Sequence, residues 1–303
     1  MSVFNAYMAL SGAYDADVSR NERLSHHTTY RIGGPAALFV TVNSYPALLK
    51  TIEILRKEGV EWVVLGKGSN ILASDRGYEG CVIVLGREFS RIAFDGCEVT
   101  AGAGASLARL VTDTLSHSLS GLECLVGIPG TVGGAISMDA GTRRDWIGSR
   151  VRDVVTLRPG EGLHRYAASD IEWGYRYTNI PTSEIILEAT LALEEAEKSQ
   201  VAERMEALVS RRRLRQPLGK PSCGSVFKNP GSRSVGQLVD SCGLKGYTVG
   251  GACVSDVHAN FIVNEGGARA ADVIAVMSHV HDTVLDRYGI DLVPEVKCLG
   301  FGA

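Results

Sequence analysis

The sequence lacks any apolar run near the ~18 residues that a membrane-spanning helix requires. Near its amino terminus, Asp15 and Asp17 interrupt the stretch where a secretory signal needs a continuous apolar core. No C-x-x-C pair occurs, and the seven cysteines are odd in number and scattered. These absences argue against a zinc site and a disulfide framework and favour reduced thiols. We therefore expect a cytoplasmic protein without a membrane segment or a bound metal.

An excess of charge of one sign is also absent. The 31 Lys and Arg residues nearly balance the 34 Asp and Glu residues, which gives a net charge of −3 at pH 7. Because nucleic-acid-binding proteins usually carry a basic surface, we expect no nucleic-acid partner. The G-x-x-x-x-G-K-[ST] spacing is missing as well, which argues against a P-loop nucleotide site.

Glycine, by contrast, is abundant, and its 35 residues gather in clusters. Such clusters mark places where the backbone closely approaches something else. Gly66–Asn70 follows an apolar segment, and its amides, lysine and serine suit an anion, although a tight turn between two strands fits the same residues. Gly127–Ala135 suits a pyrophosphate through its backbone N–H groups, or close helix–sheet packing through Gly133 and Gly134.

A third cluster, Gly102–Leu107, resembles part of a dinucleotide fingerprint. Leu107 occupies the place of the third glycine, and no clear β-α-β unit surrounds the cluster. We therefore expect it to begin a helix rather than to form a Rossmann site.

Apolar periodicity predicts helices and strands that alternate along the chain. Ser44 precedes leucines and isoleucines at helical spacing, and Gly59 ends that pattern, which predicts a helix. Residues 1–24 are interpreted as a helical extension. Near the other end, a helix is predicted over 271–288, followed by a strand over 292–297. The length of 303 residues suggests about two domains.

The stretch Pro221–Pro230 combines two hydroxyls, a thiol, an ammonium and an amide. Glycine and proline bracket it, so neither a regular helix nor a central strand fits. A loop this rich in polar groups is typical of a functional site, whereas its composition also fits a surface turn.

Taken together, several motifs resemble one family. They are Tyr30-Arg31-Ile32-Gly33-Gly34, Gly66–Asn70, Gly127–Ala135, Tyr175-Arg176, Gly224–Pro230, His258–Asn264 and Pro294-Glu295-Val296. In this order, from about residue 28 to 299, they resemble the UDP-N-acetylenolpyruvoylglucosamine reductases, called MurB. The strand at Ile185 follows Arg176 closely, so the chain resembles the shorter branch that lacks an extra tyrosine loop. The loop 140–145 departs from the resemblance because it is more charged than the family loop.

The resemblance implies an α+β fold with two domains. Residues 1–197 would form a two-lobed FAD-binding domain of the vanillyl-alcohol-oxidase (PCMH) type, with lobes of about 1–86 and 87–197. Residues 198–303 would form a smaller α+β substrate-binding domain, whose last strand packs back toward the flavin.

The resemblance also implies a reaction. NADPH would reduce FAD, and the reduced flavin would reduce the enolpyruvyl ether of UDP-N-acetylglucosamine to UDP-N-acetylmuramate, a peptidoglycan precursor. The implied catalytic residues are Arg176, Ser225 and Glu295. Arg176 and Glu295 would stabilise the enolate, and Ser225 would protonate its carbon.

Binding residues are implied in the same way. The cofactor-binding residues would be Tyr30, Arg31, Ile32, Gly66, Lys67, Gly68, Ser69, Asn70, Gly127, Ile128, Pro129, Gly130, Thr131, Gly133, Gly134 and Ala135. The substrate-binding residues would be Tyr175, Lys220, Lys228, Asn229, Gln237, Tyr247, His258 and Asn260. The FAD would be non-covalent, because no His or Cys lies in the matched flavin loops. We expect a monomer or a weak dimer.

Two other functions fit the same motifs. One is a flavoenzyme of the same domain type with a different acceptor. The other is a non-enzymatic protein that binds a nucleotide and senses cell-wall precursors. The Ser225 loop and Glu295 favour the reductase, because they belong to the expected substrate domain.

Overall fold

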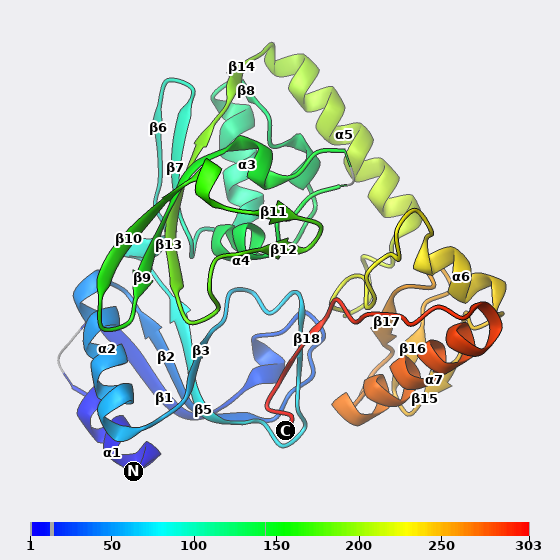
Figure 1. The fold of residues 1–303 in the computed structure, drawn as a ribbon, viewed down its shortest axis with the longest axis horizontal. Coiled ribbons are helices and arrows are strands. Elements are labelled where there is room, and N and C mark those ends of the chain that lie inside the picture. Colours follow the sequence, from blue (N-terminus) through cyan, green and yellow to red (C-terminus); the bar gives the residue numbers. More distant parts are fainter. Residues whose placement is uncertain (1, 13–14, 143, 303) are drawn as a thin grey trace. The chain divides into compact units, whose positions relative to one another are not determined.

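The computed structural model describes residues 2–12, 15–142 and 144–302 (Figure 1). The chain forms two compact units, each built from segments that are separated in the sequence. Unit 1 contains the residues up to Ser19, Phe39–Gly66 and Cys81–Arg211. Unit 2 contains Arg20–Leu38, Lys67–Gly80 and the residues from Arg212 onward. The expected functional residues are therefore distributed over both units.

A five-stranded antiparallel sheet organises unit 1, with the strand order β10-β9-β13-β7-β6. Its strands are β6 (Ile92–Asp95), β7 (Glu98–Gly102), β9 (Val151–Arg158), β10 (Gly162–Ala167) and β13 (Ile185–Ala192). Helices α3 (Leu107–Ser116) and α4 (Val132–Ser137) lie beside this sheet in Figure 1. Leu110 of α3 and Ile136 of α4 share one fully buried core with Ala189 and Leu191 of β13.

A second sheet has the order β1-β2-β5-β3. Its strands are β1 (Ala16–Arg23), β2 (Pro35–Val42), β3 (Trp62–Val64) and β5 (Tyr78–Leu85). Helix α2 (Tyr45–Glu58) joins β2 to β3, and α1 (Val3–Leu10) packs against it. The Glu88 carboxylate accepts a hydrogen bond from the Tyr45 N–H at 2.8 Å, and Gly59 ends the helix with a φ of 64°. The helix predicted from Ser44 and Gly59 is confirmed.

Unit 2 contains the three-stranded sheet β15-β16-β17. Its elements are α6 (Val235–Ser241), β15 (Thr248–Val249), β16 (Ala252–Val254), β17 (Ile262–Asn264) and α7 (Ala270–Tyr288). Helix α7 packs against β15 and β16. Val273, Val280 and Val284 recur at helical spacing and are buried in the core of this unit. The helix predicted over 271–288 is confirmed.

The carboxyl-terminal strand β18 (Lys297–Leu299) pairs in parallel with β4 (Ile71–Ala73). The Lys297 N–H also donates to the Asn70 carbonyl at 3.0 Å. The end of the chain is therefore fastened to the segment that directly follows the Gly66–Asn70 motif.

The remaining elements are short or connect the larger ones. They are α5 (Lys198–Arg215), β8 (Leu119–Ser120) paired with β14 (Glu194–Glu195), β11 (Trp173–Gly174) paired with β12 (Tyr177–Thr178), and the 3-10 helices η1 (Leu24–His26), η2 (Glu88–Ser90), η3 (Glu123–Leu125), η4 (Ile147–Arg150) and η5 (Ala168–Asp170).

Two predicted elements are corrected. The predicted helix over 1–24 is limited to α1 among the described residues, because Ala16–Arg23 forms an edge strand whose polar sequence hides its extended conformation. The strand predicted over 292–297 begins only at Lys297. Pro294 has no N–H to donate and makes a single isolated bridge with Phe227.

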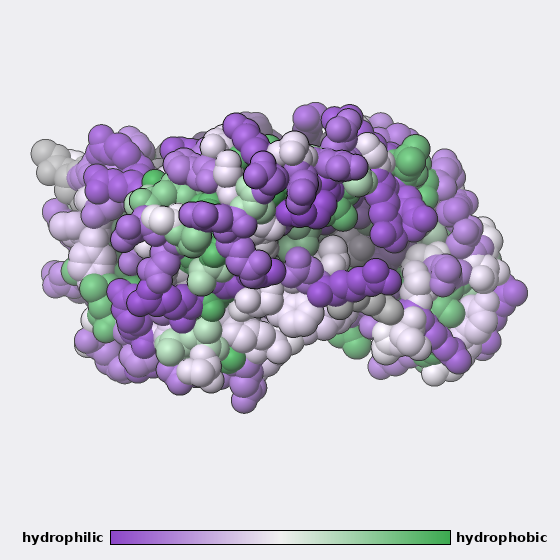
Figure 2. Space-filling view, turned by 90° about the horizontal axis from the view of Figure 1, so that it is seen from above, coloured by the Kyte–Doolittle hydropathy of each residue, from purple (hydrophilic) through white to green (hydrophobic). Residues whose placement is uncertain are grey.

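The visible face in Figure 2 is mostly hydrophilic, and its hydrophobic residues form small groups. Exposed large apolar side chains, such as Met8, Leu163 and Leu214, come from distant parts of the sequence. Within the described ranges, no helix is both long and apolar enough to cross a membrane.

We predict that Gly77→Ala destabilises unit 2 strongly. A Cβ at Gly77 would lie 1.9 Å from the Pro35 carbonyl oxygen, and the φ of 91° is already unfavourable for alanine. Gly289→Ala is the matched control, because it has a φ of 64° in the same unit but no neighbour within 4 Å. The control should cost about 1–2 kcal/mol, and Gly77→Ala clearly more. Urea unfolding followed by circular dichroism measures both, and equal midpoints would contradict the role of close packing.

Candidate functional site

Two glycine-rich loops of unit 1 are joined by backbone hydrogen bonds. The Leu107 N–H donates to the Gly130 carbonyl at 3.1 Å, and the Val132 N–H donates to the Ala105 carbonyl at 3.0 Å. The Gly133 N–H donates to the Ala103 carbonyl at 2.9 Å. Loop 102–107 therefore supports loop 127–135 from one side.

Three glycines of these loops are required by close packing. A Cβ at Gly102 or Gly104 would lie 2.1 Å from the Phe89 oxygen or 2.4 Å from the Leu85 oxygen, so both serve backbone packing. A Cβ at Gly133 would lie 2.8 Å from that of Ala103, which supports the packing interpretation for this residue. This agrees with the expectation that loop 102–107 is no dinucleotide fingerprint.

The same cluster also presents a surface that lacks side chains. Gly66, Gly127 and Gly134 are exposed, and a Cβ at Gly66 would lie 2.7 Å from Thr131 Oγ1. The strand-end turn after β3 and loop 127–135 are thus in contact. Backbone without side chains lets a pyrophosphate approach main-chain N–H groups closely, so these residues fit the phosphate part of a dinucleotide.

Arg176 lies in the tight turn between β11 and β12. The pairs Trp173–Thr178 and Gly174–Tyr177 leave Tyr175 and Arg176 as the two turn residues. Arg176 has a φ of 59°, in the left-handed region, and its guanidinium lies 5.1 Å from the centre of the exposed Tyr175 ring. Side-chain-bearing residues held in this conformation are often found at functional sites.

In unit 2, the segment with Tyr30, Arg31 and Ile32 contacts the Lys67–Asn70 segment. The Thr29 N–H donates to the Gly68 carbonyl at 3.2 Å, and a Cβ at Gly68 would lie 2.2 Å from the His27 oxygen. Tyr30 and Ile32 are buried, whereas Arg31 and Lys67 are exposed. Arg31 has a φ of 55°, so its backbone, like that of Arg176, lies in the left-handed region.

The Ser225 loop is held by a buried amide. Asn260 is 3 % exposed; its Oδ1 accepts from the Phe227 N–H at 3.1 Å, and its Nδ2 donates to the Phe227 carbonyl at 2.9 Å. Ser225 itself forms a bridge with Phe261. Asn260, expected to bind substrate, therefore fixes the backbone beside Ser225.

The structure brings the Ser225 and Glu295 segments together. The Glu295 N–H donates to the Val226 carbonyl at 2.7 Å, and Asn70 Nδ2 donates to the Glu295 carbonyl at 3.1 Å. Two of the three expected catalytic residues, together with one expected flavin residue, thus lie in one hydrogen-bonded arrangement. Arg176 belongs to unit 1, and its convergence with Ser225 and Glu295 stays a prediction.

Tyr30 and Cys223 are buried in the core of unit 2. Burial raises the pKa of the Cys223 thiol to about 12, and burial also holds the pKa of Tyr30 well above its ordinary value. Both groups therefore stay protonated at neutral pH. Cys223 behaves as a packed thiol, as expected from its size.

The other expected substrate residues of unit 2 are spread over several elements. Asn229 Oδ1 accepts from the Val235 N–H at the start of α6, and Gln237 on the same helix is exposed. Tyr247 stacks on His279 with ring centres 4.1 Å apart. Burial lowers the pKa of His258, so its ring is neutral at pH 7 and Nδ1 accepts from the Asn260 N–H.

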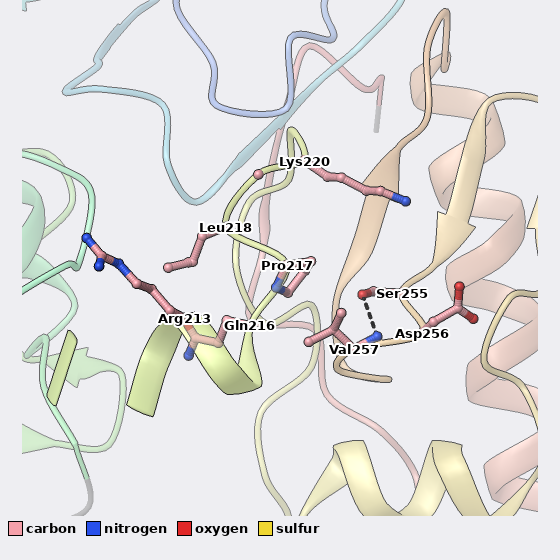
Figure 3. Close-up of a pocket in the computed structure, with 9 residues that line it drawn as sticks. Arg213, Gln216, Pro217, Leu218, Lys220, Ser255, Asp256 and Val257 are labelled. Carbon is pink, nitrogen blue, oxygen red and sulfur yellow. Dashed lines mark hydrogen bonds between the residues drawn. The ribbon is translucent and has the colours of Figure 1, made fainter. Parts of the chain in front are cut away.

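A cavity of about 450 Å³ opens in unit 2 (Figure 3). Pro217, Leu218 and Val257 give it apolar walls. Lys220, which was expected to bind substrate, lines it and forms an ion pair with Glu265 at 2.5 Å. Lys228 lies elsewhere in the Ser225 loop, and its N–H donates to the Val293 carbonyl at 2.8 Å.

Comparisons with known proteins identify both parts of the chain. Residues 36–158 match the family model of the FAD binding domain, and residues 216–299 match that of the UDP-N-acetylenolpyruvoylglucosamine reductase C-terminal domain. The UDP-N-acetylenolpyruvoylglucosamine reductase of Halalkalibacterium halodurans is 39 % identical over 285 residues, which cover 94 % of this chain and 95 % of the relative. The enzyme of Bacillus subtilis is 38 % identical over 93 % of this chain and 94 % of its own length. This chain belongs to the UDP-N-acetylenolpyruvoylglucosamine reductase family.

A solved structure of the family agrees with this fold. The reductase (MurB) from Thermus caldophilus superposes with a TM-score of 0.82 at 35 % identity, covering 94 % of this chain and 98 % of that one. The predicted family, its oxidoreductase class and the α+β fold with an FAD-binding domain are confirmed. The predicted domain boundary at 197–198 stays a prediction. The compact unit that contains the carboxyl-terminal segment also includes residues 20–38 and 67–80.

The sequence interpretation missed one charged residue near Arg176. Asp139 is 6 % exposed and lies two residues beyond the end of α4, and the charge of Arg176 lowers the pKa of its carboxylate. Because 36 residues lie between Asp139 and Arg176 in the sequence, only the folded chain shows the relation.

We predict that Gly133→Ala and Gly134→Ala differ although they are neighbours on α4. The first places a Cβ 2.8 Å from that of Ala103 and should cost about 1–3 kcal/mol through overpacking. The second meets only Thr131 Oγ1 at 3.5 Å and should be neutral or stabilising by up to about 1 kcal/mol. Tryptophan fluorescence during urea unfolding reports on unit 1, which holds all three tryptophans. Similar midpoints for both variants would refute the packing role of Gly133.

Proposed function

We propose that this chain is an NADPH-dependent flavoenzyme that reduces UDP-N-acetylglucosamine enolpyruvate to UDP-N-acetylmuramate for peptidoglycan synthesis in the cytoplasm. The observation that carries the proposal is the match of both the FAD binding domain and the reductase C-terminal domain in one chain, whose similarity to a curated relative covers 95 % of that relative. The enzyme works as a monomer or weak dimer.

The glycine-rich surface of unit 1 would hold the phosphates of FAD without a covalent bond, and Lys67–Asn70 keeps its assignment as a cofactor-binding segment. When bound, FAD supplies hydride to the enolpyruvyl double bond after its own reduction by NADPH. The exposed glycines Gly66, Gly127 and Gly134 support this assignment, because no side chain at these positions keeps a phosphate away from the main chain.

Arg176 binds the carboxylate end of the enolpyruvyl group. Hydride addition to the terminal methylene carbon leaves negative charge that spreads from the neighbouring carbon into this carboxylate. A guanidinium offers fixed N–H donors and a permanent positive charge, which matches both oxygens of the developing enolate. The left-handed φ of Arg176 supports a functional role for its position.

Ser225 gives the enolate carbon its proton. Glu295 stabilises the enolate, either as a neutral acid that donates a hydrogen bond or by orienting another donor. The backbone hydrogen bond between Glu295 and Val226 places the two segments next to each other. A serine hydroxyl is a weak acid, so its site must stabilise the alkoxide that remains. Lys220 and Lys228 are the cations that lie nearest to Ser225 in the sequence.

The substrate is held by Tyr175, Lys220, Lys228, Asn229, Gln237, Tyr247, His258 and Asn260. Asn260 acts through the loop backbone, since both ends of its amide bind Phe227. Lys228, Asn229 and Tyr247 are the candidates for the uridine end, because the extra tyrosine loop is absent from this chain.

The activity is tested with the two half-reactions kept apart. Purified protein is reduced anaerobically with NADPH, and the enolpyruvyl sugar nucleotide is then added. We expect rapid reoxidation of the flavin and formation of UDP-N-acetylmuramate. A flavin that NADPH reduces but this substrate does not reoxidise would indicate a flavoenzyme with a different acceptor, and a protein that binds no flavin would sink the proposal.

Ser225→Ala should slow the second half-reaction by roughly 10²–10⁴-fold and leave flavin reduction by NADPH nearly intact. Ser222→Ala is the matched control in the same loop, because Thr29 Oγ1 binds the Ser222 carbonyl and not its hydroxyl. The control should keep both rates. Stopped-flow absorbance of the flavin measures them, and an equal loss of both rates in Ser225→Ala would show damage to the fold instead.

A further inference from the structure

We propose that Asp139 is a positioning residue for Arg176, and that its carboxylate holds the guanidinium in the orientation used for the substrate carboxylate. The inference rests on the role given to Arg176 under the proposed function. It concerns unit 1 alone, which contains both residues.

Asp139 is a buried acid with one firmly placed oxygen. It follows α4 with a φ of 41°, is 6 % exposed, and its Oδ1 accepts from the buried Gly148 N–H at 3.0 Å. A side-chain-bearing residue with positive φ and a buried charge is costly on both counts. Because Asp139 costs stability in this position, we infer that it has a functional role.

A packed path leads from Asp139 to the Arg176 turn. A Cβ at Gly148 would lie 2.8 Å from Asp139 Oδ1 and 2.3 Å from Cε3 of Trp173, so this glycine lies between the carboxylate and the indole. The Trp173 Nε1–H donates to the Ala168 carbonyl at 3.1 Å, which fixes the ring. Trp173 begins the β11–β12 hairpin that carries Arg176, and α4 packs against β12 (Figure 1).

The charge of Arg176 also affects the Asp139 carboxylate. Burial raises the pKa of Asp139 to about 6, while the Gly148 N–H and the positive charge of Arg176 both lower it. The elements packed against α4 carry the titratable or charged residues Glu98 of β7, Arg150 of η4, Tyr177 of β12 and Glu188 of β13. Arg176 is the charged group that shifts the pKa of Asp139 within the described part of the chain.

This arrangement has two states at physiologically accessible pH. Above about pH 6, Asp139 is an anion that attracts the guanidinium; below it, the neutral acid attracts the guanidinium much less. The attraction between the Asp139 carboxylate and the Arg176 guanidinium is therefore present above about pH 6 and is lost as pH falls through this value. The Gly148 hydrogen bond keeps the acid in place in both states.

Asp139→Asn tests the proposal, because the amide oxygen keeps the Gly148 hydrogen bond and removes the charge. We expect the rate of flavin reoxidation by the enolpyruvyl substrate to fall about 10–100-fold at pH 8, the scale of a misplaced catalytic group. Flavin reduction by NADPH should stay unchanged. The wild-type rate should decrease as pH drops through about 6, and that step should be missing in the variant.

Asp145→Asn is the matched control, because it removes an acid of the same unit, whose Oδ1 accepts from the Ser149 hydroxyl at 3.3 Å. It should keep the wild-type rates and pH profile. Equal rates and equal pH profiles for wild type and Asp139→Asn would overturn the proposal. A loss of NADPH-dependent reduction in Asp139→Asn would also overturn it, by showing a structural role.

The double variant separates this inference from the proposed function. In an Arg176→Ala background, Asp139→Asn should have no further effect on single-turnover reoxidation, since no guanidinium remains to be held. An undiminished effect in that background would overturn the positioning role and leave the proposed function intact. If Arg176→Ala alone kept the wild-type rate, the role of Arg176 in the proposed function would fail, and the inference with it.

Discussion

Close approach of backbone segments holds the loops that carry the candidate functional residues in unit 1 and in unit 2. In unit 2, a Cβ at Gly34 would lie 2.3 Å from the Asp75 oxygen, and one at Gly300 would lie 1.9 Å from the Gly77 oxygen. In unit 1, Gly133 meets Ala103 in the same way. These contacts leave no room for a side chain, so glycine is required where the loops that carry functional residues meet the rest of their unit.

Backbone contacts hold the segment of each candidate catalytic residue. Arg176 is fixed by a two-residue hairpin turn, and Ser225 by a loop that the Asn260 amide binds on both sides. Glu295 is fixed by a main-chain bond to Val226. These bonds set the backbone positions of the candidate residues before a ligand binds, which is the preorganisation that catalysis of a charged transition state needs.

Sequence patterns predicted the elements whose signals are local. The helix at Tyr45–Glu58 begins and ends where Ser44 and Gly59 indicated, and α7 follows its valine spacing. The strand Ala16–Arg23 was missed, because an edge strand buries little and its polar residues show no apolar alternation. The strand near Glu295 was placed too early, because pairing partners, not composition, decide where a ladder starts.

The sequence by itself determined the family, the glycine-rich loops and the identity of the expected catalytic residues, because each of these is written in short contiguous motifs. Only the tertiary structure decided that residues 20–38 and 67–80 join the carboxyl-terminal segment in one unit, that Asn260 supports the Ser225 loop, and that Asp139 is buried where the charge of Arg176 lowers its pKa. These relations depend on burial and on contacts between residues far apart in the chain, and such contacts leave no periodic trace in the order of the residues.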